Sequence, residues 1–316
     1  MNKLNIVVLD GDTLPERPFA FDFPHTLTRY GTTTPDQVSE RLHGMDIAIS
    51  NKVPVSAAAM AENPQLRLIA VAATGVNHID TEAARQSGVA VCNVRGYGNE
   101  SVAEHAFMLM ITLMRNLPAY RRDVAAGLWE QSPLFCHFGS PIRDLNGKTL
   151  AVFGKGATGQ TLAGYARAFH MNVVFAEHKH AQTVREGYVS FDDALRCADV
   201  VSLHCPLNRD TQGLIGETEL QKMKPGAVLI NCGRGGLVDE HALVAALKYG
   251  QIGGAGFDVL TTEPPRNGNP LLKTSLPNLI VTPHIAWASQ EAVDNLLRIL
   301  TDNINLFVAG KAQNLV

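Results

Sequence analysis

Short apolar runs separated by amphipathic segments make up most of the chain. Apolar runs bounded by glycine, proline and polar residues are typical of strands buried in a parallel sheet, and a 3.6-residue apolar period is typical of covering helices. The pattern predicts strands at 4–9, 47–50, 66–73, 89–94, 150–153, 172–176, 200–204, 227–231, 254–258 and 279–282, with residues 10–33 irregular. This alternation predicts an α/β protein with two doubly wound parallel sheets, each covered by helices on both faces.

Capping residues mark the expected helix ends. Thr34 and Gln37 can form a capping box with Pro35 in the first turn, and this helix should stop near Gly44. Asp80 can cap a short helix that ends at Gly88. Further helices are predicted at 157–170, 191–197, 218–223, 239–249 and 289–308, with Asp239 capping the fourth of these and Gly250 ending it.

Residues 101–147 contain unusually many large apolar side chains. Ser101 and Glu104 read as a capping box that opens a helix at 104–116, which is apolar on nearly all sides. A helix of this kind is normally buried, so it could lie between two domains or in a subunit contact. Pro118 should bend or end the helix. Residues 127–147 read as a loop whose aromatic side chains, Trp129, Phe135 and Phe138, are exposed or packed on a partner.

A glycine-rich turn joins the strand at 150–153 to the helix after it. Gly154 allows the tight turn, Gly156 lets the backbone approach a pyrophosphate, and Gly159 lets the helix pack close to the strand. Ala157 and Thr158 begin the helix, where free N–H groups favour phosphate. The spacing alone is weak evidence because the chain has 27 glycines. The surrounding strand and helix, with acidic Glu177 about 20 residues on, favour a dinucleotide site over a purely structural turn.

Composition narrows the functional classes. The 316 residues allow two domains, and the net charge of −3 without a basic run argues against a nucleic-acid partner. Five scattered cysteines argue for a reducing compartment and against disulfides or structural zinc. No HExxH motif and no other metal constellation stands out, so we expect no metal. The N-terminus does not resemble a signal peptide, and no apolar stretch reaches membrane-spanning length, so we expect a soluble cytoplasmic protein.

Polar residues follow several strands at the sheet edge where ligands bind in open α/β folds. In the second sheet they are His204, Pro206, residues 231–234, Asp258 and His284. Arg234, flanked by glycines, is suited to bind a carboxylate, or is a surface arginine in a turn. His284 is an acid–base candidate, or a packed histidine. Glu263, stiffened by two prolines, could stabilise an imidazolium, or is a solvated loop acid.

Taken together, these motifs resemble the D-2-hydroxyacid dehydrogenase family over nearly the whole chain. The segments that carry the resemblance are 73–80, 101–105, 154–159, 204–207, 223–227, 231–240, 258–265 and 282–287. Within the family, 72–77, 93–97 and 283–287 look most like members that act on glycerate and hydroxypyruvate.

The resemblance implies that Arg234, Glu263 and His284 are the catalytic residues. It implies a flavodoxin-like substrate domain at 1–100 and 287–316, with a Rossmann cofactor domain inserted at 101–286, and a homodimer. The implied dinucleotide contacts are Ser101, Gly154, Gly156, Ala157, Thr158, Gly159, Glu177, His204, Pro206, Cys232, Gly233, Arg234, Asp258 and His284. The implied substrate contacts are Thr74, Gly75, Val76, Arg234 and His284, and strand-end position adds Asn51, Lys52, His78 and Trp287 as candidates.

The cofactor and substrate keep alternatives at this stage. Glu177 should hold the ribose hydroxyls and repel a 2′-phosphate, which favours NAD, whereas the cations His178, Lys179, His180 and Arg185 could accept NADP. Phosphoglycerate, glyoxylate or pyruvate chemistry are rival enzyme functions. A formate dehydrogenase is disfavoured because such relatives have an amide where Glu263 stands. A non-catalytic NADH-sensing protein is the alternative from another class.

Overall fold

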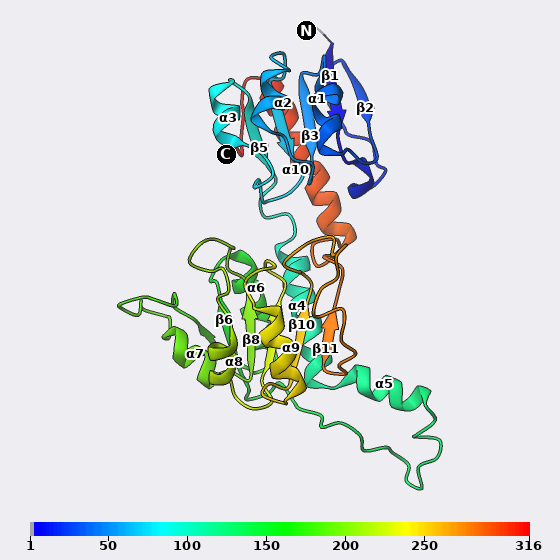
Figure 1. The fold of residues 1–316 in the computed structure, drawn as a ribbon, viewed down its shortest axis with the longest axis vertical. Helices are drawn as coiled ribbons and strands as arrows, with labels where there is room; N and C mark the ends of the chain where they lie inside the picture. The colour runs from blue at the N-terminus through cyan, green and yellow to red at the C-terminus, as the bar shows by residue number, and fades with distance from the viewer. Residues whose placement is uncertain (1–2) are drawn as a thin grey trace. The chain divides into compact units, whose positions relative to one another are not determined.

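The computed structural model describes residues 3–316, which form two compact units (Figure 1). The first unit comprises the chain up to Gly98 together with Ser289–Val316. The second unit is the continuous segment Asn99–Ala288. Each unit is built around its own parallel sheet, as the strand–helix alternation predicted.

The first unit has a five-stranded sheet in the order β2-β1-β3-β4-β5, with every pair parallel. Its strands are β1 (Leu4–Val8), β2 (His25–Arg29), β3 (Ile47–Ser50), β4 (Leu68–Val71) and β5 (Ala90–Asn93). This is the flavodoxin-like order. The expectation that residues 10–33 are irregular was wrong, because β2 pairs with β1 as an edge strand and its mostly polar sequence hides the strand pattern.

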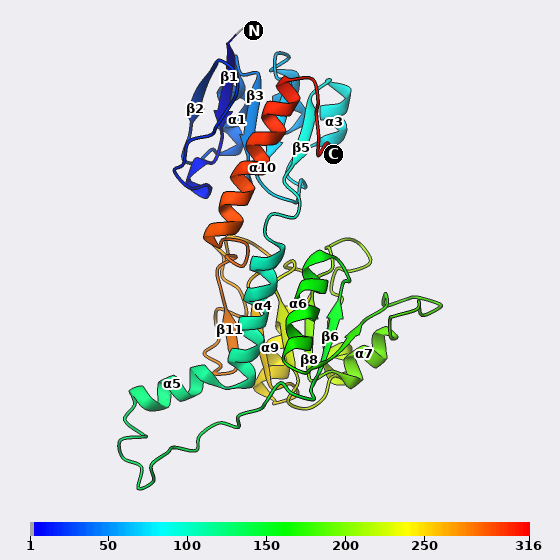
Figure 2. The ribbon, with the colours of Figure 1, turned by 180° about the vertical axis from the view of Figure 1, so that it is seen from behind.

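Short helices cover one face of this sheet and a long helix covers the other (Figure 2). The short elements are η1 (Gly11–Thr13), η2 (Pro35–Gln37), α1 (Val38–Leu42), α2 (Ala57–Ala61) and α3 (Thr81–Gln86). The capping box of Thr34 and Gln37 is confirmed, and Asp80 accepts a hydrogen bond from the Ala83 N–H at 3.0 Å. Helix α2, which follows the cap Ser56, was not predicted.

The long helix α10 (Gln290–Val308) returns the chain to the first unit and contacts β4. The nearly buried Asn303 amide donates to the Asn93 carbonyl at 3.0 Å. Beyond the helix, Leu315 forms an antiparallel bridge with Cys92, and the Val316 N–H donates to the Val91 carbonyl at 3.0 Å. Residues from the two ends of the sequence therefore share one core.

The second unit has a six-stranded parallel sheet in the order β11-β10-β9-β8-β6-β7. Its strands are β6 (Thr149–Phe153), β7 (Asn172–Phe175), β8 (Val200–Leu203), β9 (Val228–Asn231), β10 (Gly254–Phe257) and β11 (Leu279–Val281). A single parallel bridge between Ala176 and Val189 extends the sheet beyond β7. After β6 the chain adds β7 on one side of it and then β8 on the other, so the order of strands reverses between β6 and β8. Ligands bind at this switch point in doubly wound folds.

Alternate residues of each strand build the two cores of this unit. In β6, Leu150 and Val152 pack under α4 (Asn99–Met114) and α6 (Ala157–Ala168). Ala151 and Phe153 face the opposite layer, formed by α7 (Phe191–Cys197), α8 (Glu217–Lys222) and α9 (Glu240–Lys248) (Figures 1 and 2). None of the helices within residues 3–316 is long and apolar enough to span a membrane.

Helix α4 begins earlier than the sequence indicated. The capping-box expectation for Ser101 and Glu104 was wrong, because the helix already starts at Asn99 and Ser101 lies inside its first turn. The apolar side of α4 packs against α6, β9 and β10, so its buried face belongs to the second unit. Asn116, at φ 50°, ends the helix before Pro118, and α5 (Leu117–Ala125) follows as an element that was not predicted.

Candidate active site

The glycine turn after β6 leaves room for a ligand. Gly154 has φ +113°, and a side chain there would meet the His204 carbonyl at 2.7 Å, so only glycine fits between the ends of β6 and β8. A Cβ on Gly159 would lie 2.1 Å from the Gly154 carbonyl oxygen. A Cβ on Gly156 would meet no atom within 4 Å, so nothing in the protein packs on that side of the turn.

Helix α6 starts at Ala157, directly after the turn. The first N–H groups of a helix have no partner within the helix, and they carry partial positive charge toward the turn. The open side of Gly156 and the start of α6 together form a cradle that fits a pyrophosphate. Thr158 uses its hydroxyl to bind the Asn99 side-chain oxygen at 3.2 Å, which ties α6 to the start of α4.

Glu177, which follows β7, has its carboxylate paired with Arg185. One oxygen accepts from the His178 N–H at 2.9 Å and from Arg185 Nη2 at 2.6 Å. The other accepts from the Arg185 backbone N–H at 3.1 Å and from Nε at 2.7 Å. The Arg185 hydrogen bonds, with help from the His178 amide, hold the pKa of Glu177 at about 2, so the carboxylate is ionised throughout the working pH range.

The ends of β8 and β9 carry buried groups. His204 Nε2 pairs with the Ser202 hydroxyl at 2.8 Å, and burial lowers the pKa of His204 to about 4, so the ring is neutral near pH 7. Burial, followed by the charge of Asp258, raises the pKa of the Cys232 thiol. The Pro206 carbonyl accepts from the Thr211 hydroxyl at 2.6 Å, which folds the chain back after the strand.

Arg234 lies in a braced turn after β9. The buried Asn231 side chain donates to the Arg234 carbonyl at 2.9 Å and accepts from the Gly233 N–H at 3.1 Å. The exposed guanidinium of Arg234 donates to the Gly233 carbonyl through Nη1 at 2.8 Å. A Cβ on Gly235 would lie 1.8 Å from the Leu260 carbonyl oxygen, so this turn packs directly against the loop that carries Glu263.

Glu263 and His284 are joined by a short hydrogen bond. Glu263 Oε2 lies 2.5 Å from His284 Nδ1, and Oε1 accepts from the Leu260 N–H at 2.8 Å. About one third of each side chain is exposed, so water and small molecules can reach the pair. Because Nδ1 faces the carboxylate, Nε2 is the nitrogen through which the ring can exchange a proton with a ligand.

A second set of residues holds His284 in place. His284 has φ 55°, an unfavourable backbone conformation for a residue with a side chain. Asp258, which is 1% exposed, accepts from the Ile285 N–H at 3.0 Å and the Ala286 N–H at 2.8 Å, and from the Thr282 hydroxyl at 2.6 Å. Trp287 donates its indole N–H to the His284 carbonyl at 3.0 Å. These bonds fix the loop and therefore the direction of the imidazole.

Two residues that help to hold the His284 loop, His105 and Thr282, were not identified as site residues from the sequence. His105 Nε2 pairs with the Thr282 hydroxyl at 2.9 Å, and Ser101 donates to the Ala286 carbonyl at 2.6 Å. Ser101 and His105 are four residues apart in α4, so they share one face of the helix. The spacing of Ser101 and His105 is the sequence signal that could have identified His105.

The predicted substrate residues other than Arg234, His284 and Trp287 lie in the first unit. Asp10 accepts from the N–H groups of Asn51 at 2.9 Å and Lys52 at 2.6 Å, which orders the chain after β3. Thr74 donates its hydroxyl to the Val94 carbonyl at 2.9 Å and accepts at its own carbonyl from Asn93 at 2.7 Å, which fixes the 74–76 turn. His78 has its Nε2 buried without a hydrogen-bond partner among the described residues, and burial lowers its pKa.

Within residues 3–316, no group of three or more histidine, cysteine, aspartate or glutamate side chains is placed to hold a metal ion. The second unit instead combines a dinucleotide cradle, an arginine and a histidine–carboxylate pair at the carboxyl ends of its parallel strands. This combination defines a nicotinamide-dependent oxidoreductase in which the protein supplies the acid–base group.

The family follows from comparison with known proteins. Residues 107–286 match the model of the NAD-binding domain of D-isomer specific 2-hydroxyacid dehydrogenases. The chain belongs to this family and is an NAD-dependent oxidoreductase that acts on CH–OH groups.

Full-length relatives and a solved structure agree. The chain is 47% identical over 312 residues to a glycerate dehydrogenase of Methylorubrum extorquens, with 98% of both chains covered. It is 34% identical to a hydroxypyruvate reductase of Blautia hydrogenotrophica, with 99% of both covered. A D-lactate dehydrogenase of Aquifex aeolicus, solved with NAD and lactic acid, superimposes with a TM-score of 0.81 at 27% identity, covering 97% of this chain and 96% of that one.

Proposed function

We propose that this protein interconverts D-glycerate and hydroxypyruvate with NAD(H), as a glycerate dehydrogenase, also called hydroxypyruvate reductase. The observation that carries the proposal is the hydrogen bond between Glu263 and His284, with 2.5 Å between Oε2 and Nδ1, in the loops that follow β10 and β11 of the sheet whose strand β6 leads into the glycine turn. The near full-length similarity to a glycerate dehydrogenase supports the choice of substrate.

The proposed chemistry assigns one task to each catalytic residue. In the direction of reduction, His284 donates the Nε2 proton to the C2 oxygen of the oxo acid as negative charge develops there. Glu263 stabilises the imidazolium before this transfer and orients the ring through Nδ1. Arg234 binds the substrate carboxylate with its guanidinium. When bound, NADH supplies the hydride that reduces C2. The exposed part of His284 lets the ring regain its proton from water.

We further propose that the first unit is the substrate domain and the second the NAD-binding domain. Within the second unit, the residues proposed to contact NAD are Ser101, Gly154, Gly156, Ala157, Thr158, Gly159, Glu177, His204, Pro206, Cys232, Gly233, Arg234, Asp258 and His284. The backbone at Thr74, Gly75 and Val76 would bind the second carboxylate oxygen, and Lys52, Asn51, His78 and Trp287 would select the side chain of the acid. The braced 74–76 turn and the ordered 51–52 segment support this role.

A homodimer in a reducing cytoplasm is the proposed working form. The five thiols are all free, and Cys92, Cys197, Cys205 and Cys232 have pKa values raised by burial, which suits a compartment without disulfide formation. Residues 128–142 expose several large apolar side chains, of which Phe135 is 93% and Phe138 is 83% exposed. Apolar exposure on this scale favours a partner surface.

The test follows the absorbance of NADH with four oxo acids: hydroxypyruvate, glyoxylate, pyruvate and phosphohydroxypyruvate. We expect the highest kcat/KM with hydroxypyruvate. A higher value with the phosphorylated acid would assign the protein to phosphoglycerate chemistry, and a higher value with glyoxylate or pyruvate would assign it to another 2-oxo acid. No oxidation with any of them, despite NADH binding, would favour a dinucleotide-sensing protein.

A further inference from the structure

The carboxylate of Glu177 is saturated by protein donors. Four hydrogen bonds reach its two oxygens, three of them from Arg185, and its side chain is 2% exposed. A carboxylate has about four acceptor positions, so Glu177 can bind the two hydroxyls of an adenosine ribose, as its proposed contact with NAD requires, only where Arg185 gives up some of its hydrogen bonds. Glu177, which was expected to select NAD, is therefore covered by Arg185, and Arg185 is the side chain that a ligand would meet.

Pairing also removes the expected repulsion of a 2′-phosphate. The bond with Arg185 keeps the pKa of Glu177 at about 2, so the carboxylate stays charged, and the adjacent guanidinium neutralises that charge. Just over half of the Arg185 side chain is exposed, and its Nη1 lies outside the pair with Glu177. The outward surface of this ion pair is therefore cationic.

A second cation, Lys155, contacts the same aromatic ring as Arg185. The Arg185 guanidinium stacks 4.2 Å from the centre of the Tyr188 ring, and the Lys155 ammonium lies 4.7 Å from the same centre. Lys155 is the residue between Gly154 and Gly156 in the glycine turn, and its ammonium also lies 4.9 Å from the Phe175 ring. The aromatic rings hold both cations at the carboxyl end of β7, where an adenosine ribose binds in this fold.

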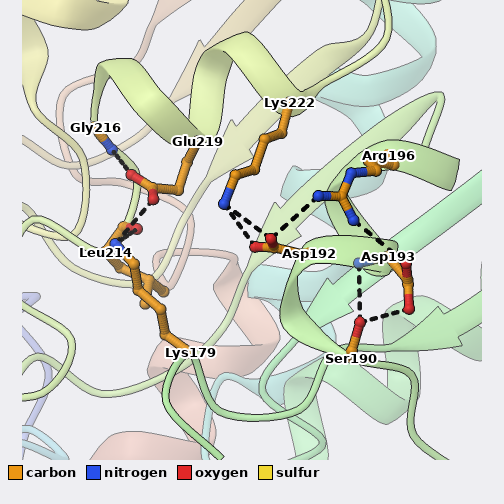
Figure 3. A network of polar contacts seen from close by, with 9 residues as sticks. All are labelled: Lys179, Ser190, Asp192, Asp193, Arg196, Leu214, Gly216, Glu219 and Lys222. Carbon is orange, nitrogen blue, oxygen red and sulfur yellow. Dashed lines mark hydrogen bonds and ion pairs between the residues drawn. The ribbon is translucent and has the colours of Figure 1, made fainter.

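Two other lysines, Lys179 and Lys222, line the same pocket as Glu177, and both are already paired with carboxylates. Lys179 donates to the Leu214 carbonyl at 3.2 Å and pairs with Glu219 at 3.1 Å (Figure 3). Lys222 pairs with Asp192 at 2.8 Å in the same network. Lys179 was one of the cations that the sequence offered as a possible phosphate ligand, and the structure commits it to α8 instead. Arg185 is therefore the cation bound to Glu177, and Lys155 shares the Tyr188 ring with it.

We propose that Arg185, together with Lys155, forms a subsite for the 2′-phosphate of NADPH, so that the protein accepts NADPH as well as NADH. The proposal rests on the dinucleotide-binding role of the second unit and adds a specificity-determining pair to it. A planar guanidinium fixed by a carboxylate and an aromatic ring is preorganised for a phosphate, because little side-chain freedom is lost on binding.

The test measures binding of two adenosine fragments by calorimetry, with no turnover required. Adenosine 5′-monophosphate carries no 2′-phosphate, and adenosine 2′,5′-bisphosphate carries one. We expect the native protein to bind the bisphosphate at least as tightly as the monophosphate, and added salt to weaken the bisphosphate more. We expect Arg185→Met to weaken the bisphosphate by about ten- to a hundredfold, the worth of a hydrogen bond to a charged group, and the monophosphate by less than about threefold.

Matched variants separate a ligand contact from loss of structure. Arg196→Met removes an arginine of the second unit that is 57% exposed and paired with Asp192 and Asp193, as Figure 3 shows, and it should change neither affinity. Lys155→Met should weaken only the bisphosphate, and Glu177→Gln should strengthen it relative to the monophosphate. These two variants keep the test decisive if Arg185→Met folds poorly.

Three outcomes would overturn the proposal. The first is a native protein that binds the monophosphate much more tightly than the bisphosphate. The second is an equal loss of both ligands in Arg185→Met, which would mean that Arg185 only holds the loop together. The third is binding of neither fragment to the native protein, which would count against the dinucleotide site as well; failure with hydroxypyruvate alone would leave this inference standing.

Discussion

At His284 the main chain adopts a left-handed conformation that costs on the order of 1 kcal/mol or more for a residue with a side chain. Three bonds to Asp258 and one from Trp287 hold the surrounding loop against this cost. These contacts stabilise the strained backbone at His284 and so fix the orientation of its imidazole. Asp258 was expected to contact the dinucleotide, and that role stays a prediction; the contacts described for it are those of a positioning residue.

Replacement of His284 by asparagine tests the proton-transfer role. Asparagine tolerates the left-handed conformation, so the fold should persist. We expect His284→Asn to lower kcat by about 10²- to 10⁴-fold, the usual contribution of a general acid, while the Kd for NADH measured by fluorescence stays within about threefold. Near-native turnover would remove His284 from this role.

His204 gives stability a specific pH dependence. Burial lowers its pKa from 6.5 to about 4, so between these values the unfolded chain binds a proton that the folded chain does not. The contribution of His204 to the free energy of unfolding is therefore fully present above pH 6.5 and is lost progressively as the pH falls toward 4. The loss is about 2 kcal/mol, less than the full pKa difference implies, because His204 is only partly shielded from water.

Urea unfolding at pH 7.5 and pH 5 measures this effect. The loss of stability on acidification should be smaller in His204→Gln than in the native protein. His180→Gln, at an exposed histidine of the same unit, should leave the loss unchanged. An identical pH dependence in His204→Gln and the native protein would refute the assignment.

Individual site residues were predictable from the sequence to the extent that strand ends predict them. Arg234 and His284 were identified because each follows an apolar run, and parallel strands bring their carboxyl ends to one edge. The pairing of Glu177 with Arg185 could not be predicted, because it depends on how the loop between them folds. The contact between His105 and Thr282 could not be predicted either, because it depends on how α4 packs against the loop after β11.

At the scale of elements, the strands buried on both faces were easier to predict from the sequence than the edge strand and the helix ends. Strands with continuous apolar runs were predicted within one or two residues, as for β3 and β8, because burial on both faces leaves a clear pattern. The polar edge strand β2 and the start of α4 were missed, because edge exposure and a misleading Ser–Glu spacing outweighed the local signal.

Two alanine substitutions in α6 separate its close contact with β6 from its helix propensity. Gly159→Ala places a methyl group 2.1 Å from the Gly154 carbonyl oxygen, so we expect a loss of about 1–3 kcal/mol and weaker NADH binding. Gly164→Ala, in the same helix with nothing within 4 Å, should gain about 0.5–1 kcal/mol and bind NADH normally. Denaturant unfolding and NADH titration measure both, and similar effects of the two changes would contradict the packing argument.

At the scale of the whole molecule, the segment at 128–142 exposes large apolar side chains close together in the sequence, among them Phe135 and Phe138. We expect the double change Phe135→Ser with Phe138→Ser to convert a dimer into a monomer at micromolar concentration in analytical ultracentrifugation. Tyr249→Ser, at a residue 88% exposed elsewhere on the second unit, is the control and should leave the mass unchanged. A native protein that already sediments as a monomer would rule out the proposed dimer.

The return of α10 to the first unit has a consequence for biosynthesis. The second unit is one continuous segment, so all of its residues have left the ribosome before Ser289–Val316 follows. The first unit emerges earlier, yet one face of its sheet stays bare until Ser289–Val316 has left the exit tunnel. The segment made first is therefore completed last, and chaperone protection during translation matters most for it.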